Sequence, residues 1–152
     1  NASIGQGYYL TNPLQLAVMA TRIATGRHVE PSLLKSNRNK PFASLDFKPD
    51  QIAYIRKAMS DVVNGPGTAG RARLPIEDVL IAGKTGTAQN PQGEDHSLFI
   101  AFAPYQEPEI AVAVVVEAGG PGGARAGPVA RRVIEAYLES SGYDFGDGPT
   151  AA

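Results

Sequence analysis

The sequence predicts an α+β fold, an antiparallel β-meander covered by helices. Three segments, 79–89, 97–103 and 109–117, have the two-residue period or the continuous apolar character of strands. The links between them, 90–95 and 104–108, are short and turn-like, and connections this short join antiparallel neighbours. Helical patterns precede and follow this block, so we expect the sheet to lie between helices.

Two helices are expected before the sheet. Asn12 can cap the first helix, Pro13 suits its first position, and Gly26 suits its end. The second helix is expected over 49–63. Apolar residues recur at helical spacing in both, which predicts one buried stripe on each. The stripes are Leu16, Met19, Ala20 and Ile23 in the first helix, and Ile52, Ile55, Met59, Val62 and Val63 in the second.

The last predicted strand is apolar on both faces, and a last helix follows it. One face carries Ile110, Val112, Val114 and Val116, and the other carries Ala111, Ala113 and Val115. Such a strand is covered on both faces, and the smaller Ala side would let a helix approach closely. Pro128 fits the first turn of the last helix. The predicted stripe of that helix is Val129, Val133, Ile134, Tyr137 and Leu138.

Composition excludes several functional classes. With 152 residues, 43% hydrophobic and 19% charged, the chain has the size and character of one folded domain. Its 14 Lys+Arg against 15 Asp+Glu give a net charge of −1, so there is no basic excess for nucleic acid. Cysteine is absent and only two histidines are present, so thiol chemistry is ruled out and no metal site or cofactor is expected.

The ends of the chain and its hydropathy lead to two further expectations. No apolar run reaches about 18 residues, the length that spans a membrane. The chain begins Asn1-Ala2-Ser3, without Met or a signal peptide, and we expect it to be a piece of a longer product.

The sharpest chemical motif is Lys84-Thr85-Gly86-Thr87, on the first predicted strand. Thr85 and Thr87 are two residues apart and therefore share one face of the strand. Two hydroxyls and an ammonium suit a carboxylate, and Gly86 would let a ligand backbone come close. The strand could pair with an extended peptide, and the Thr87 N–H could be one oxyanion donor, worth about 3 kcal/mol. Taken alone, so short a motif also occurs by chance.

Three longer strings place this motif in a wider pattern. They are SIGQGYYLTNPLQLA (Ser3 to Ala17), AGKTGTAQ (Ala82 to Gln89) and DHSLFIAFAPY (Asp95 to Tyr105). In order and spacing the strings resemble the penicillin-binding transpeptidases, above all the class B group of cell elongation, penicillin-binding protein 2. The family usually has Thr-Pro where this chain has Asn12-Pro13, a mild departure because both Thr and Asn cap helices.

The resemblance reaches to about Leu138 and covers nearly the whole chain. It implies that residues 1–140 are the C-terminal portion of a transpeptidase domain, within the penicillin-binding, serine β-lactamase-like fold. We expect residues 141–152 to be a flexible C-terminal tail.

The activity implied by this resemblance is peptidoglycan D,D-transpeptidation during cell elongation, inhibited by β-lactams. The family uses the motifs S-x-x-K, S-x-N and K-T-G. Its serine attacks the D-Ala-D-Ala end of a stem peptide and forms an acyl-enzyme. The resemblance implies that Lys84 is catalytic through its charge. It also implies that Thr85, Gly86 and Thr87 bind the substrate or antibiotic, with the Thr87 N–H in the oxyanion hole.

The resemblance also implies a location and partners. The protein would lie at the inner membrane with this domain on the periplasmic face and its anchor outside this chain. Its partners would be the N-terminal remainder of the same protein and a membrane glycan polymerase. His96, which follows Asp95, is a candidate neighbour of the site, although a turn or edge histidine bonded to its neighbours is the favoured interpretation.

Two of the three family motifs are missing. Ser32-Leu33-Leu34-Lys35 matches S-x-x-K, but it follows Pro31 in a polar stretch, and in the family the nucleophile precedes the SIGQG segment. We interpret it as a chance match. Ser60-Asp61-Val62 departs from S-x-N at its third place. We therefore expect the nucleophilic serine to lie N-terminal to Asn1, and the chain alone to be inactive.

The sequence leaves some alternatives open. A β-lactamase or a β-lactam sensor also uses K-T-G, and a non-catalytic scaffold could keep the fold and bind partners. Nucleotide binding by Gly83-Lys84-Thr85 is disfavoured, because Asp78 stands where a P-loop needs its first glycine. Arg71 and Arg73, in the loop before the motif, could touch peptidoglycan or be solvated.

Overall fold

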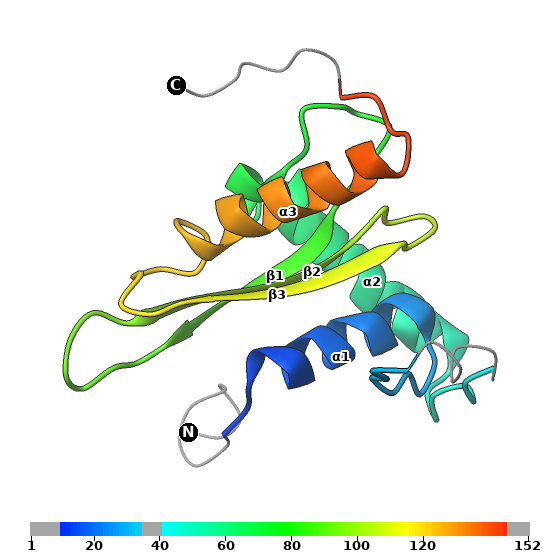
Figure 1. Cartoon of the computed structure of the whole chain (residues 1–152), viewed down its shortest axis with the longest axis horizontal. Helices are drawn as coiled ribbons and strands as arrows, with labels where there is room; N and C mark the ends of the chain where they lie inside the picture. Colours follow the sequence, from blue (N-terminus) through cyan, green and yellow to red (C-terminus); the bar gives the residue numbers. More distant parts are fainter. Residues whose placement is uncertain (1–9, 35–40, 146–152) are drawn as a thin grey trace.

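The computed structural model describes residues 10–34 and 41–145 (Figure 1). The strands are β1 (Ala82–Ala88), β2 (His96–Ala103) and β3 (Ile110–Val116). The helices are α1 (Pro13–Thr25), α2 (Pro49–Asn64) and α3 (Ala126–Ser140), with a short 3-10 helix η3 (Gly70–Ala72) before β1. In Figure 1, α3 lies on one side of the sheet and α1 on the other. The predicted α+β class, with the sheet between helices, is confirmed.

The sheet is the predicted antiparallel meander, in the order β1-β2-β3. Thr85 lies opposite Phe99, and Phe99 lies opposite Val114, so these three side chains share one face. Among the strands that the structure describes, β1 has a neighbour on one side only. The motif strand is therefore an edge strand.

The first strand is shorter than the sequence predicted. β1 begins at Ala82, whereas the prediction placed its start at Val79. The Leu80 carbonyl instead accepts a hydrogen bond from the N–H of Tyr105 (2.8 Å). Val79 and Ile81 are buried, and their apolar character is what extended the predicted strand.

Helices cover both faces of β3, as its residues predicted. Val112 lies in the main core cluster with Ile134 and Leu138 of α3. On the opposite face, Ala111 packs in a second cluster with Ala24 of α1. The small alanines let α1 approach the sheet closely, while the larger valine side meets α3.

The ends of α1 follow the predicted signals. The Asn12 side chain accepts a hydrogen bond from the Gln15 N–H (2.9 Å), and the Gln15 side chain accepts one from the Asn12 N–H (3.0 Å). Together they form a capping box, which satisfies two otherwise unpaired donors. Gly26 ends the helix with φ of 66°, in the left-handed region that glycine tolerates best.

The predicted stripe of α3 is wrong for three of its five residues. Val129, Val133 and Tyr137 are between 41% and 48% exposed. The buried residues are Ala126, Gly127, Ala130, Ile134 and Leu138. The helix turns its row of small residues inward, and Ala126 and Ala130 are fully buried there against the main core cluster. Sequence analysis favoured the larger side chains on the neighbouring row.

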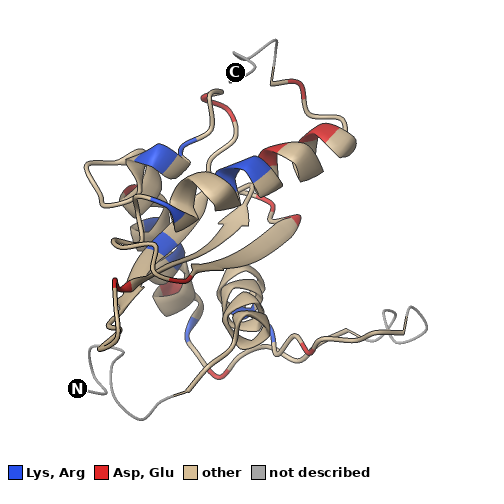
Figure 2. Cartoon of the chain, turned by 60° about the vertical axis from the view of Figure 1, so that its left-hand side comes forward, with Lys and Arg blue, Asp and Glu red and all other residues tan. Residues whose placement is uncertain are grey.

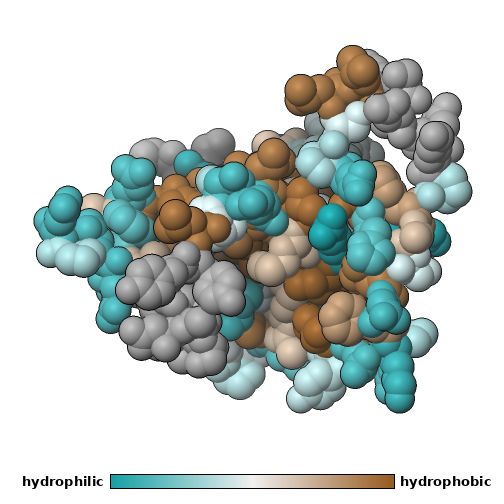
Figure 3. Space-filling model, turned by 90° about the horizontal axis from the view of Figure 1, so that it is seen from below, coloured by the Kyte–Doolittle hydropathy of each residue, from teal (hydrophilic) through white to brown (hydrophobic). Residues whose placement is uncertain are grey.

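The stripes of α1 and α2 are only partly covered by the sheet. Met19 is 43% exposed and Ile55 is 38% exposed, although both were predicted to be buried. They lie in a groove of about 710 Å³ between the two helices. Apolar residues that line it include Leu14, Val18, Ile23, Phe47 and Ile52. Figure 3, which views the molecule from the side of α1, shows hydrophobic side chains gathered on this face.

Charges of both signs are spread over the surface. Figure 2 shows Lys and Arg in the earlier turns of α3 and acidic residues toward its C-terminal end. Arg131 and Glu135 form an ion pair of 2.8 Å on this helix. Within the described residues, no helix combines the length and apolar character needed to cross a membrane.

The first five residues of the predicted tail lie within the described part. Tyr143 and Phe145 pack against the main core cluster. The hydroxyl of Tyr143 donates a hydrogen bond to Glu109 Oε1 (2.7 Å). Residues 146–152 lie outside the described part, and a flexible tail stays a prediction.

Candidate functional site

The two threonines of the motif open onto one groove. Thr85 and Thr87 project from the same face of β1, as their spacing predicted. The groove has a volume of about 680 Å³ and lies between β1, the η3 loop and the loop before α3. Its lining residues are Thr68, Gly70, Arg71, Thr85, Thr87, Pro121, Gly122, Gly123 and Ala124.

The Lys84 side chain leaves the opposite face of β1, but its end returns to Thr85. Its side chain lies beside Met59 and Ile100 in an apolar hollow against α2. Its Nζ nevertheless donates to the carbonyl of Thr85 (2.7 Å) and to the Thr85 hydroxyl oxygen (3.4 Å). The ammonium and the Thr85 hydroxyl therefore meet, although their side chains start in opposite directions.

Hydrogen bonds orient both threonine hydroxyls. Thr85 Oγ1 lies 2.9 Å from Thr68 Oγ1, and either hydroxyl can donate. Thr87 Oγ1 accepts a longer bond from the Gly122 N–H (3.4 Å). The η3 loop thus positions one hydroxyl and the loop before α3 positions the other.

Two glycines bring the loop before α3 against its neighbours. A Cβ on Gly122 would lie 2.2 Å from the Gly86 carbonyl oxygen and 2.6 Å from that of Leu98. A Cβ on Gly123 would lie 2.2 Å from the Thr68 carbonyl oxygen. No side chain fits at either position. The two glycines therefore let the loop lie directly on its neighbours, and their backbone forms part of the groove lining.

A buried serine anchors the same loop. Ser97 of β2 is fully buried, and its Oγ lies 3.1 Å from the carbonyl oxygens of both Pro121 and Gly122. The same oxygen accepts a hydrogen bond from the Ala126 N–H (3.1 Å) at the start of α3. These contacts join β2 to the wall of the groove, and they satisfy a hydroxyl that burial would otherwise penalise.

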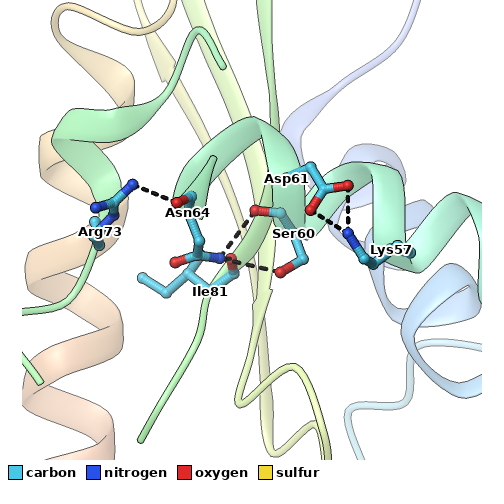
Figure 4. Close-up of polar contacts among 6 residues, drawn as sticks. All are labelled: Lys57, Ser60, Asp61, Asn64, Arg73 and Ile81. Carbon is cyan, nitrogen blue, oxygen red and sulfur yellow. Dashed lines mark hydrogen bonds and ion pairs between the residues drawn. The ribbon is translucent and has the colours of Figure 1, made fainter. Parts of the chain in front are cut away.

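Asn64 ties the end of α2 to the start of the motif strand (Figure 4). Its Nδ2 donates to the Ile81 carbonyl (2.8 Å) and to the Ser60 carbonyl (2.9 Å). The carbonyl of Asn64 accepts a hydrogen bond from the Arg73 guanidinium in the same view. The helix and the strand are therefore held together just before the motif.

The structure separates the residues whose roles the sequence left open. Arg71 lines the groove beside the threonines, whereas Arg73 is turned to the Asn64 carbonyl. His96 Nδ1 accepts a hydrogen bond from the Ala118 N–H (3.0 Å). His96 is thus bonded to a neighbouring segment and does not line the groove, but it begins β2, the central strand of the sheet, and is not on an edge strand.

Neither formal serine motif lies at the groove. Ser32 Oγ donates to the Leu34 carbonyl (3.0 Å) and accepts from the Leu34 N–H (3.2 Å), in a segment without helix. Ser60 is buried within α2 and accepts a hydrogen bond from Asn64 Nδ2. Lys35 and the SIGQG segment fall outside the described residues.

The groove carries positive charge and no acidic residue in its described lining. Arg71 is the charged residue of that lining, and Lys84 stands next to Thr85. Neither forms an ion pair with residues 10–34 or 41–145. That part of the chain also holds no group of three His, Cys, Asp or Glu suited to a metal ion. Hydroxyls and cations in this arrangement favour an anion such as a carboxylate.

Sequence analysis missed Thr68 and Ser97. A lone serine within an apolar strand was a usable signal for Ser97, because a buried hydroxyl requires partners. Thr68 lies in the Gly-rich loop 65–73, which read as a connection. Its contact with Thr85 follows from the path of an irregular loop, and no local pattern indicates that path.

Comparison with known proteins identifies the family. Residues 1–135 match the family model described as the penicillin binding protein transpeptidase domain. The chain belongs to this family, as its strings implied.

The relatives are much longer than this chain. It is 39% identical to the peptidoglycan D,D-transpeptidase MrdA of Acinetobacter baumannii, over 91% of this chain and 24% of the relative. The structure of penicillin-binding protein PBP2 from Helicobacter pylori matches with a TM-score of 0.78 and 31% identity, over 94% and 27% of the two chains. Penicillin-binding protein A from Mycobacterium tuberculosis, an imipenem acyl-enzyme complex, matches with a TM-score of 0.71 and 34% identity, over 90% and 33%. The chain therefore spans about a quarter to a third of these relatives.

Proposed function

We propose that this chain forms the K-T-G-T wall of the active site in a peptidoglycan D,D-transpeptidase of cell elongation. One observation carries the proposal: Lys84 Nζ meets Thr85, and the hydroxyls of Thr85 and Thr87 open onto one groove of an edge strand. This array suits the carboxylate that ends a D-Ala-D-Ala stem peptide or that a β-lactam carries. The activity named for the Acinetobacter baumannii relative supports the assignment, as does the imipenem acyl-enzyme of the Mycobacterium tuberculosis protein.

In this proposal the nucleophilic serine comes from outside the chain. The serine hydroxyl attacks the penultimate D-Ala carbonyl, the peptide C–N bond breaks, and the terminal D-Ala leaves with a proton on its amine. An amine from a neighbouring stem peptide then takes the acyl group and releases the serine. A β-lactam acylates the same serine by opening of its ring C–N bond, and its acyl group stays.

The motif residues divide the roles in this chemistry, and Thr87 has two of them. Lys84 supplies a fixed positive charge beside the reacting groups, and Thr85 and Thr87 bind the carboxylate. The Thr87 N–H donates to the oxyanion. The backbone groups of residues two apart on a strand point to the same edge of that strand. The Thr85 carbonyl accepts a bond from Lys84 Nζ and so points away from β2, which supports the same direction for the Thr87 N–H. Gly86 leaves the face of the strand opposite the threonines without a side chain, where a Cβ would lie 3.3 Å from the Cβ of Leu98.

We also infer that the remainder of the same protein packs on the groove between α1 and α2. Met19 and Ile55 are exposed there on an apolar surface (Figure 3), which favours burial at about 25 cal/mol per Å². The length of the relatives supports this inference, since each is about three to four times as long as the part matched here and so has further residues that could cover the groove.

The proposed setting is the periplasmic face of the inner membrane, with the anchor outside this chain. Stem peptides and β-lactams are the proposed ligands, and a membrane glycan polymerase is the proposed partner. The PBP2 of Helicobacter pylori forms a complex with MreC, which supports the proposal that this protein also acts within a larger assembly.

Covalent labelling by fluorescent penicillin tests the proposed function. The complete protein should be labelled, and Lys84→Ala should slow labelling by about a hundredfold, as the loss of one electrostatic group does in acyl-transfer sites. Lys57→Ala is the matched control, because Lys57 is an exposed lysine of α2 paired with Asp61, and it should label at the normal rate. Unchanged labelling of Lys84→Ala would contradict the assigned site.

Two further measurements separate the alternatives. Residues 1–152 alone should neither be labelled nor hydrolyse a D-Ala-D-Ala peptide, and a covalent label on Ser32 would contradict an external nucleophile. In the complete protein the penicilloyl group should leave slowly. Rapid release would instead identify a β-lactamase.

A further inference from the structure

The η3 loop faces the motif strand across the groove. Thr68 and Arg71 come from one side of the groove, and Thr85 and Thr87 come from the other. The four side chains therefore surround the same space of about 680 Å³. A ligand that reaches the two threonines also reaches the η3 loop.

The hydroxyl of Thr68 is hydrogen-bonded to that of Thr85. The two Oγ1 atoms lie 2.9 Å apart, so one hydroxyl donates to the other. The Thr68 backbone is itself held, because Gly123 packs on its carbonyl at a distance that no side chain would allow. Thr68 is therefore a fixed partner, and it restricts the directions in which the Thr85 hydroxyl can face a ligand.

Arg71 offers a guanidinium that the described chain does not use. It forms no hydrogen bond or ion pair with any residue of 10–34 or 41–145, and no carboxylate stands in the described lining. Arg73, two residues further along the same loop, is by contrast bonded to the Asn64 carbonyl. A planar guanidinium can bind a carboxylate through two parallel hydrogen bonds, which a single ammonium cannot do.

We propose that Arg71 is a second cationic ligand for the carboxylate of the stem peptide or β-lactam, and that Thr68 is a positioning residue for Thr85. This inference rests on the proposed function. It makes the η3 loop part of the carboxylate site, opposite the K-T-G-T strand. The loop then discriminates between acids and neutral analogues of the same ligand.

A pair of probes that differ only in the carboxylate tests the role of Arg71. The complete protein is exposed to benzylpenicillin or to its methyl ester, and acylation is read as loss of later labelling by fluorescent penicillin. Arg71→Ala should lower the acid-to-ester ratio of acylation rates by about tenfold, which corresponds to ~1.4 kcal/mol. The rate with the ester should stay near that of the unaltered protein, and Arg71→Lys should retain part of the ratio. An unchanged ratio in Arg71→Ala would overturn the assignment.

The same measurement tests Thr68 and supplies the control. Thr68→Val should lower the acid-to-ester ratio, and Thr68→Ser should restore it, because serine keeps the hydroxyl. A low ratio in both variants would overturn the positioning role. Arg73→Ala removes a charge from the same loop outside the groove, and an equal fall of the ratio there would also count against the inference. If neither probe acylates the unaltered protein, the proposed function fails and this inference fails with it; an unchanged ratio with normal acylation overturns the inference alone.

Discussion

Gly122 rests on the backbone of Gly86, so closely that a Cβ on Gly122 would lie 2.2 Å from the Gly86 carbonyl oxygen. The contact lies between Thr85 and Thr87 along the strand, and the Gly122 N–H donates to the Thr87 hydroxyl. The loop before α3 and the K-T-G-T strand therefore form one structural unit, and a shift of the loop would move the Thr87 hydroxyl.

Gly122→Ala should disturb this unit. The added methyl group must push the loop away from β1, and overpacking of this kind costs about 1–3 kcal/mol of unfolding free energy. We expect a lower melting temperature and slower labelling of the complete protein by fluorescent penicillin. Gly127→Ala is the control, because its Cβ would make an ordinary 3.6 Å contact with Ala72 and alanine favours a helix. Equal losses in both variants would show that the Gly86 contact has no special weight.

Asn64→Ala should loosen the start of the motif strand. The change removes the donor to the Ile81 carbonyl, and a buried acceptor left unpaired costs about 1–3 kcal/mol. Thermal unfolding of the complete protein measures the loss. Lys57→Ala is the matched change on the same helix, where an exposed ion pair with Asp61 contributes about 0.5 kcal/mol or less. A melting temperature that falls no further for Asn64→Ala than for Lys57→Ala would contradict the role of Asn64.

Oxidation of methionine should reveal whether the groove between α1 and α2 is covered in the complete protein. Met19 is 43% exposed in this chain, whereas Met59 is only 6% exposed. Hydrogen peroxide should therefore oxidise Met19 quickly in residues 1–152 alone and slowly in the complete protein, as measured by mass spectrometry. Met59 reports folding, since it should react slowly in both. Fast oxidation of Met19 in the complete protein would contradict packing of the remainder on this groove.

The sequence predicted those features that depend on local chemistry. Asn12 and Gly26 carry their own capping signals, and the spacing of Thr85 and Thr87 dictates a shared face. The outer row of α3 was mispredicted because hydropathy ranks Val133 above an alanine, while close packing requires the smaller residue. The apolar stripes of α1 and α2 likewise do not indicate which of their residues the sheet covers, and Met19 and Ile55 are left exposed.

The rest of the site depends on contacts between distant segments. Thr68 and Thr85 meet through a loop without a repeating pattern, and Gly122 reaches Gly86 from beyond two further strands. Pattern reasoning can register that a loop is rich in glycine. It cannot show which other segment of the backbone packs against those glycines.

Tyr143 and Glu109 give a prediction that depends on pH. The Tyr143 hydroxyl donates to Glu109 Oε1 (2.7 Å), and this bond is the main cause that raises the pKa of Tyr143 above its ordinary value of 10.0. The folded state thus holds the phenol proton more tightly than the unfolded state. The stabilisation from this contact is present below the ordinary pKa and is lost as the pH rises through the raised folded pKa.

Glu109→Ala should lower the pKa of Tyr143 more than Glu107→Ala does, because Glu109→Ala removes the hydrogen-bond acceptor as well as a charge, whereas Glu107 acts only through its charge and is the smallest contributor. Ultraviolet difference titration of each variant against the same variant carrying Tyr143→Phe isolates this one phenol. Equal shifts in the two variants would show that the pKa responds to general negative charge and not to the hydrogen bond. In that case Tyr143 would not be bonded to Glu109 in solution, and Tyr143→Phe would leave the alkaline unfolding profile unchanged.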